Sequence, residues 1–455
     1  MLALALLATL PLTFHYDASE FTNAVYQVSC LTNRVPCTNA LFTRFWDTEA
    51  QLTPADTTQL DAWLEIFRKI ENAAPSPPAA PLLPNYTSYY PSLKARHTIV
   101  AAAVESRSPE DFRRRAAKLI NAADADRLSQ VLGHFQHRLH PWWLATGRHS
   151  VETHIRQVRH QMHAASLLPL TTQVAAFLEA DLPTRDIYIH AIPAPFPASK
   201  NASATVIANH FFVEILPSDK PQDTIWKAMH ELTHAFYDSA PAARHLSLMN
   251  QFVAAESPQS FYAFLNESLA TAVQLLVYER KGITDNDPYH HPYIPRLGRS
   301  TMPLLKDALA NNRTLFEGFA GPYVRAGAAE LKEETTNPKF VLSATAVLAS
   351  EKNRKAFDMF FRRLQPNFYL TTEEEWMLFT RLNAVRLLTY DELPPFASEI
   401  PNVDSLTKGS AFAYALMRHD KGTVFVLAGR DPGALVEAVK RLAKLPSVPS
   451  HGLIF

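Results

Sequence analysis

The sequence has little glycine, little cysteine and no excess of charge. Its 455 residues include 12 glycines and two cysteines, and 44 lysines and arginines balance 44 aspartates and glutamates. With so few glycines, the chain has no glycine-rich loop of the kind that holds a nucleotide phosphate. The balanced charge gives no attraction to nucleic acid or to an acidic membrane surface. We therefore expect no nucleic-acid partner.

Long apolar runs are also scarce. Residues 2–14 (LALALLATLPLTF) form one, but it is shorter than the roughly 20 residues that a membrane-spanning helix needs. Its length fits a cleaved signal peptide at residues 1–14, although no lysine or arginine precedes Arg34, and a buried N-terminal helix or strand is the alternative. The sequence thus predicts an exported protein, periplasmic or secreted, without a transmembrane helix in the mature chain.

Cys30 and Cys37 are the two cysteines of the chain. In an exported protein they can form a disulfide that closes a short loop, whereas in the cytosol two buried thiols are equally ordinary. Because we expect export, we predict that the two cysteines are joined.

Residues 230–234 read His-Glu-Leu-Thr-His, the most informative string in the chain. On a helix, residues i and i+4 lie on one face, so His230 and His234 can direct their imidazoles at one metal ion. Glu231 points about 100° further round the helix, where it can take a proton from a water molecule at the metal. Pro221 is tolerated in the first turn of such a helix. Apolar residues follow at helical spacing: Ile225, Met229, Leu232 and Phe236.

Two segments before this helix are rich in β-branched and aromatic residues. They are residues 185–195 and 204–216, and a polar connection at 199–203 separates them. The pattern predicts a β-hairpin that leads into the metal-binding helix. An extended peptide substrate could add to an open edge of the 204–216 strand through backbone hydrogen bonds.

A catalytic zinc ion usually has three protein ligands and leaves its fourth position to water. Glu267 is the best candidate for the third ligand, because residues 258–282 carry apolar side chains at helical spacing and predict a second helix. Glu256 is the competitor, but it precedes a serine-proline pair that disfavours helix. A third histidine in the pattern HExxHxxGxxH is excluded, because Tyr237 and Ala240 stand at its last two positions.

These motifs resemble those of the gluzincin metallopeptidases, the group that includes thermolysin and the aminopeptidase N family. The shared parts are residues 230–234 and residues 266–270, Asn-Glu-Ser-Leu-Ala, which look like the Asn-Glu-x-x-Ala motif of those enzymes. The resemblance implies one Zn²⁺ per chain and assigns roles to four residues: the ligands His230, His234 and Glu267, and the general base Glu231.

The resemblance covers roughly residues 185–282 and is distant from both named enzymes. More residues lie between the two motifs in this sequence than in thermolysin or aminopeptidase N. Thr271 also stands where thermolysin-like enzymes carry an aspartate that orients a ligand histidine.

The substrate oxygen that becomes negatively charged during hydrolysis needs a hydrogen-bond donor besides the metal, and the resemblance implies a tyrosine or a histidine. The candidates after the second helix are His290, His291, Tyr293 and Tyr323. Each also has an ordinary interpretation as a loop residue or a packed aromatic. We select Tyr293 as the catalytic donor.

The sequence predicts an α+β fold that is mostly helical, with a zincin-like catalytic core made of a small β-sheet and two packed metal-binding helices. The expected divisions are a signal peptide at 1–14, a helical N-terminal region at 15–181, the core at 182–299 and a helical C-terminal region at 300–455. This last region ends in a β-hairpin, residues 411–417 and 423–428, and a helix at 432–445. Residues 285–299 are expected to be irregular.

The predicted function is zinc-dependent hydrolysis of peptide bonds, with a peptide or protein as substrate. One alternative is a zinc hydrolase of a non-peptide amide or ester, which would use the same ligands. Another is a catalytically silent zinc-containing binding protein. Glu231 argues against the second alternative, because a structural zinc site is closed by four ligands and needs no adjacent base.

Overall fold

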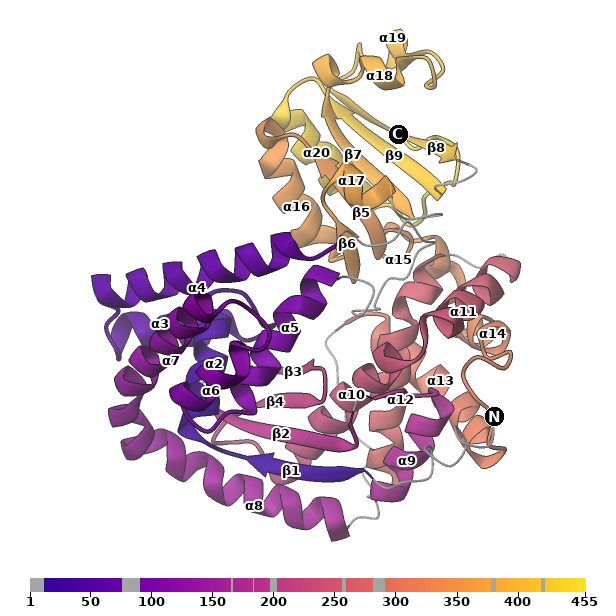
Figure 1. The fold of residues 1–455 in the computed structure, drawn as a ribbon. Coiled ribbons are helices and arrows are strands. Elements are labelled where there is room, and N and C mark those ends of the chain that lie inside the picture. Colours follow the sequence, from indigo (N-terminus) through magenta and orange to yellow (C-terminus); the bar gives the residue numbers. More distant parts are fainter. Residues whose placement is uncertain are drawn as a thin grey trace.

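The fold combines many helices with two small β-sheets (Figure 1). The computed structural model describes residues 12–75, 91–164, 167–182, 184–196, 203–255, 259–280, 291–377, 382–418 and 422–455. The α+β, mostly helical class expected from the sequence is confirmed. Within these ranges, every helix is too short or too polar to cross a bilayer.

The first sheet contains four strands. They are β1 (Thr13–Asp17), β2 (Asp186–Pro193), β3 (Ala204–Ile207) and β4 (His210–Ile215). Their order is β1-β2-β4-β3, in which β2 is parallel to both β1 and β4, whereas β3 is antiparallel to β4. β3 therefore forms one edge of the sheet.

The predicted hairpin between residues 185–195 and 204–216 is wrong in its pairing. The turn lies inside the second segment, at Ala208 and Asn209, and β2 pairs with β4 in parallel. Ala208 has a left-handed φ of 55°, and the Asn209 side chain donates a hydrogen bond to the Asp186 carbonyl at 2.8 Å. Apolar runs on both sides conceal this turn in the sequence, because Asn209 alone is a usual turn residue.

Alternate side chains of the first sheet enter two different hydrophobic cores. Ile189 and Phe211 join the core that contains side chains of α8 (Arg148–Ala164) and α10 (Pro221–Ser239). On the opposite face, Phe212 joins a core formed with the helices of the N-terminal region. The sheet is therefore covered by helices on both faces, and α10 contacts β3 and β4 (Figure 1).

The N-terminal region is mainly helical. Its described helices before α8 are α2 (Glu20–Leu31), α3 (Asn39–Thr48), α4 (Pro54–Ala73), α5 (Pro91–Val104), α6 (Pro109–Ala116) and α7 (Ala122–Trp142), and α9 (Leu167–Phe177) follows α8. Several begin at capping residues that the sequence displays. Thr53 and Asp56 form a reciprocal capping box at α4, and Ser108 accepts the Asp111 N–H at α6.

The predicted signal-peptide boundary at residue 14 falls within a strand. Residues 13–17 pair in register with residues 186–190, so cleavage beyond Asp17 would remove an edge strand of the first sheet. Cys30 and Cys37 are joined by a disulfide, as expected from the sequence, with their Cα atoms 5.9 Å apart.

The C-terminal region differs most from its prediction. After α13 (Ile294–Ala310) and α14 (Ala320–Leu331), the chain forms a six-stranded sheet of order β10-β8-β9-β7-β5-β6. Its strands are β5 (Ala344–Ala349), β6 (Phe368–Leu370), β7 (Asn383–Thr389), β8 (Ala411–Arg418), β9 (Gly422–Gly429) and β10 (Gly452–Leu453). The predicted hairpin is confirmed as β8 and β9, and the helix after it as α20 (Pro432–Leu442). The hairpin turn at 419–421 lies outside the described residues.

The sequence prediction misses β5 and β7 because both faces of these strands are covered. β5, β7 and β9 are parallel neighbours, and strands covered on both faces lack the regular alternation of polar and apolar residues that marks a half-buried strand. One face packs against α16 (Arg354–Leu364) and α20, and the other joins the core that contains α12 (Gln259–Arg280). The remaining α-helices of the described chain are α11 (Ala242–Ala254), α15 (Pro338–Val341), α17 (Glu373–Met377), α18 (Pro394–Ala397) and α19 (Val403–Leu406).

Candidate metal site

The first of the two helices that form the site is α10. It begins after Lys220, whose backbone N–H donates to the Asp223 carboxylate at 2.7 Å, and Pro221 occupies the first turn. The apolar residues that predict this helix are all buried: Ile225, Met229, Leu232 and Phe236. They fix α10 against the first sheet and thereby fix the direction in which His230 and His234 project.

The second helix, α12, packs against α10 and brings Glu267 to the two histidines. The Nε2 atoms of His230 and His234 are 3.1 Å apart. Glu267 Oε2 lies 3.4 Å from His230 Nε2 and 3.7 Å from His234 Nε2. We call these three residues the metal triad, and no other group of three His, Cys, Asp or Glu in the described part of the chain converges in this way.

The metal triad fits a zinc ion in its chemistry and in its surroundings. Two imidazoles and one carboxylate are a known ligand set for catalytic zinc. The ligand atoms lie within 4.8 Å of one another, so one ion can contact all three. Glu267 Oε2 is buried without a well-formed hydrogen bond to the described residues, which is costly for a carboxylate oxygen unless a cation neutralises it.

The two glutamates of the site have opposite electrostatic surroundings. Burial opposes the ionisation of Glu267, but the imidazoles of His234 and His230 outweigh it and lower the pKa of Glu267 to about 2. Burial raises the pKa of Glu231 to about 7, with His234 acting against this change and Glu267 adding to it. A carboxylate that stays ionised suits a metal ligand, and one that titrates near neutrality suits a general base.

Asn266, the residue before Glu267, orients one imidazole of the metal triad. Its Oδ1 lies 2.9 Å from His234 Nδ1, so it accepts the Nδ1 proton and leaves the Nε2 lone pair for a metal. Thr271 does not take this part, because its side chain packs closely against Gly298 of α13. Asn266 is the first residue of the Asn-Glu-x-x-Ala motif, and its place in that motif is the sequence signal for this orienting role.

Asn266→Ala is expected to weaken zinc binding by about 10–100-fold, the usual cost of losing a partner that orients a ligand. Asn266→Asp keeps an acceptor at the same place and should keep most of the affinity. Competition with a chromogenic chelator measures both variants against wild type. Wild-type affinity in Asn266→Ala would contradict the orienting role.

Tyr293, predicted as the donor to the substrate oxygen, lies in aromatic surroundings. It is 3% exposed at the start of α13 and packs against Phe264 and Phe340. Burial raises the pKa of Tyr293 to about 12, and the charged side chains that act on its hydroxyl are Glu334 and Arg296. Among the described residues, no hydrogen bond joins this hydroxyl to the metal triad, so the geometry gives its assigned role no support.

His291 is better placed than Tyr293. Its Nδ1 accepts the backbone N–H groups of Tyr293 at 3.2 Å and Ile294 at 3.4 Å, so the ring proton lies on Nε2. Burial lowers the pKa of His291 to about 4, and the charge of Glu267 acts in the opposite direction. The ring is therefore neutral, lies within electrostatic reach of the metal triad and has one N–H to donate.

The other candidates named from the sequence do not join the site. Tyr323 is fully buried, its hydroxyl lies 3.1 Å from Ser268 Oγ, and its ring packs against aromatic residues of the core. His290 and Glu256 lie outside the described residues.

A buried carboxylate that shares the neighbour Tyr26 with Glu231 is absent from the sequence prediction. Glu214 on β4 accepts hydrogen bonds from the Tyr26 hydroxyl at 2.9 Å, from the Thr38 N–H at 2.9 Å and hydroxyl at 2.6 Å, and from the Ser203 N–H at 2.7 Å. Burial raises the pKa of Tyr26 well above its ordinary value. The charge and hydrogen bond of Glu214 raise this pKa further, and so does the charge of Glu231. Glu214 thus holds Thr38, which follows the disulfide, and Ser203, which precedes β3. It also holds Tyr26, on which the charge of Glu231 acts.

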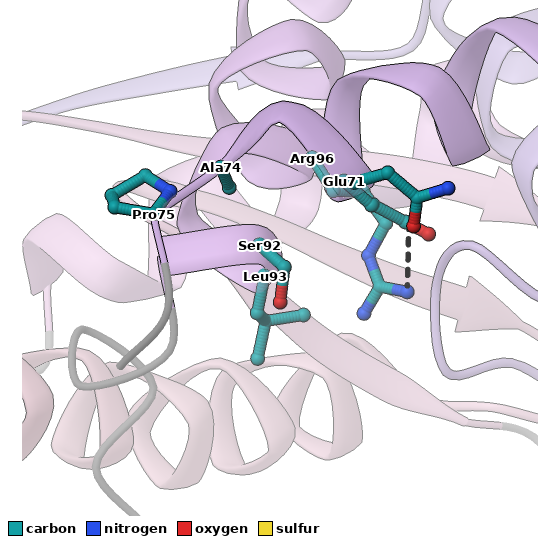
Figure 2. A pocket seen from close by; sticks show the side chains of 7 residues that line it. Glu71, Ala74, Pro75, Ser92, Leu93 and Arg96 are labelled. Carbon is teal, nitrogen blue, oxygen red and sulfur yellow. Dashed lines mark ion pairs between the residues drawn. The ribbon is translucent and has the colours of Figure 1, made fainter. Parts of the chain in front are cut away.

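Figure 2 shows a hollow between α4 and α5, with a volume of about 440 Å³. The ion pair between Glu71 and Arg96, with 3.6 Å between nitrogen and oxygen, forms part of its wall. Neither helix carries a residue of the metal triad, so this hollow is not part of the candidate metal site.

The metal triad therefore has to be interpreted from its own chemistry. Comparison with known proteins gives no match: no family model, no curated protein and no solved structure matches the chain.

Proposed function

We propose that this protein is a zinc-dependent metallopeptidase with a zincin-like catalytic core. The observation that carries the proposal is the convergence of His230, His234 and Glu267 on one point, on two packed helices. Glu231, the residue after His230, is half-buried and lies within electrostatic reach of His234 and Glu267. A structural zinc site would have a fourth ligand and no adjacent base.

Each residue then has a defined part in hydrolysis. A zinc ion held by the metal triad would polarise the substrate carbonyl and lower the pKa of a water molecule. Glu231 takes a proton from the attacking water and delivers it to the leaving amine. One carboxyl group therefore serves first as base and then as acid.

We assign the donor to the substrate oxygen to His291 instead of Tyr293. The N–H groups at the start of α13 fix its Nδ1, so its Nε2–H is the ring proton that can be donated to an oxygen that gains negative charge. The contribution of Tyr293 is its backbone N–H, which orients the imidazole of His291.

The substrate is proposed to bind along β3. This strand is at the edge of the first sheet and contacts α10, which carries two of the ligands. An extended peptide can add to such an edge through main-chain hydrogen bonds, which give affinity with little dependence on sequence. Glu214 fixes Ser203, the residue before β3, and so helps to hold this edge in place.

The disulfide supports a further part of the proposal, that the protein is exported to the periplasm or secreted. Disulfides such as Cys30–Cys37 form and persist in oxidising compartments and are rare in the cytosol.

Cleavage of a mixed peptide library tests the proposed function. Protein loaded with zinc should cleave peptides, a chelator should abolish cleavage, and added zinc should restore it. The termini of the products distinguish internal cleavage from removal of end residues. Cleavage of esters or non-peptide amides alone would indicate a different zinc hydrolase, and no cleavage of any substrate would favour a binding protein.

A further inference from the structure

Two buried histidines link two carboxylates across the first sheet. Asp17 Oδ2 lies 3.0 Å from His190 Nδ1, and His190 Nε2 lies 3.0 Å from His210 Nδ1. His210 Nε2 lies 3.3 Å from Glu105 Oε1. The imidazoles are 1% and 0% exposed, whereas the carboxylates at the two ends are 32% and 37% exposed. We call Asp17, His190, His210 and Glu105 the histidine chain.

The histidine chain joins three neighbouring strands, β1, β2 and β4, to the residue that follows α5. It lies on the sheet face that packs against the N-terminal helices, where the His190 ring stacks on Phe212 with 5.0 Å between centroids. The His210 ring stacks in the same way on Tyr188 at 4.8 Å. Its nitrogen and oxygen atoms meet in pairs and do not converge on one point, so the chain does not form a metal site.

Counting protons shows that the histidine chain is incomplete when both imidazoles are neutral. Its three contacts need one proton each. Two neutral imidazoles supply two protons, and ionised Asp17 and Glu105 supply none. One of the three contacts then has no hydrogen, so that two lone pairs face each other. The contact between His210 and Glu105 is the longest of the three, as expected if it is the one without a proton.

We propose that the histidine chain is a one-proton switch, in which acidification adds a proton at the contact between His210 and Glu105 and completes the third hydrogen bond of the chain. The proton can enter from solvent through the partly exposed carboxylate of Glu105. Without it, Glu105 is held by Arg115 at 3.1 Å. Because the two imidazoles share a hydrogen bond, the proton belongs to the whole chain and not to one residue.

The groups around the histidine chain come from every element that packs on it. On α6, Arg115 contacts Glu105 and also Asp111 at 3.6 Å. On β2, Tyr188 lies between the rings of His210 and His15, and the His15 ring bonds Asp186 at the sheet edge. At the other end, burial opposes ionisation of Asp17. Hydrogen bonds from His190, Thr22 and Ser19 outweigh this and hold the pKa of Asp17 below its usual value.

The direction of the stability change follows from His210. Burial lowers the pKa of His210, although Glu105 partly offsets this. In the unfolded chain a histidine takes up its proton at about pH 6.5, so the unfolded state is protonated first and stability declines as the pH falls through that value. Glu105 limits this decline, because its carboxylate favours protonated His210 in the folded state. Removing the charge of Glu105 should therefore make the loss of stability on acidification larger.

Glu105→Gln tests the switch, with Glu110→Gln as the matched control. A glutamine amide can donate to neutral His210 while its carbonyl still accepts from Arg115, so the three contacts are complete without an added proton. The His210 ring should then stay neutral to a lower pH than in wild type, as followed by NMR of ¹⁵N-histidine-labelled protein. Glu110 is an exposed carboxylate on α6 that pairs with Arg113, and its variant should titrate like wild type.

Thermal unfolding near pH 7 and near pH 5 provides a second measurement. Acidification should lower the Tm of Glu105→Gln by roughly 1–2 °C more than that of the Glu110→Gln control. The same His210 titration in Glu105→Gln and in wild type would overturn the proposal. A wild-type His210 that already carries both ring protons at neutral pH would also overturn it.

Discussion

Glu231→Gln is expected to keep zinc and to lose hydrolysis. The substitution preserves the shape of the side chain and leaves all three residues of the metal triad in place, so elemental analysis should still find about one zinc per chain. The amide cannot take the proton of the attacking water, and kcat should therefore fall by about 10²–10⁴-fold or more. Steady-state kinetics on a peptide selected from the library measure the change.

A second substitution at the same position separates the proton transfer from the shape of the site. Glu231→Asp keeps a carboxylate but withdraws it by one methylene, so it should retain more of the rate than Glu231→Gln. Hydrolysis by Glu231→Gln at the wild-type rate would contradict the role of Glu231 as general base.

The metal triad is predictable from the sequence because helix geometry determines most of it. His234 follows His230 by four positions, and one turn of any helix then brings them together. Glu267 follows from the apolar periodicity of a second helix. The choice of His291 as the proposed donor to the substrate oxygen is not predictable in this way. It depends on how α13 begins, since backbone N–H groups at its start decide how the His291 ring is held.

Buried polar contacts between distant parts of the chain account for much of what the sequence does not reveal. Glu214 accepts hydrogen bonds from Tyr26 and Thr38, which are 188 and 176 residues away. His210 and Glu105 are 105 residues apart. Apolar periodicity indicates which face of a helix or strand is buried, but not which buried polar groups will meet, because the packing of whole elements decides that.

The same distinction applies to the fold. The β8–β9 hairpin is predictable because its strands are close in sequence and Gly422 adopts a φ of 81° beside the turn. β5 and β7 pair in parallel, which needs a long connection and gives no turn signal between them. β1 and β2 likewise pair in parallel across the whole N-terminal helical region.

Glu267→Ala is expected to abolish both zinc binding and hydrolysis. The substitution removes the only carboxylate of the metal triad and leaves two imidazoles. Losing a ligand should cost more than the ~10–100-fold in affinity that is typical of losing an orienting partner. Zinc content after dialysis against a weak chelator and cleavage of the library peptide measure the two effects, and both should fall to background.

Control variants separate the loss of a ligand from misfolding and from a wrong assignment. Glu279→Ala removes a carboxylate from the same helix, but Glu279 is exposed and pairs with Lys306, so zinc content and activity should stay at wild type. Glu267→Ala should also keep the circular dichroism of metal-free wild type, because buried apolar residues such as Leu265 and Leu269 hold α12 in place. Glu256→Ala addresses the competing ligand. If it loses zinc while Glu267→Ala keeps it, the third ligand is Glu256, and the metal triad is assigned wrongly.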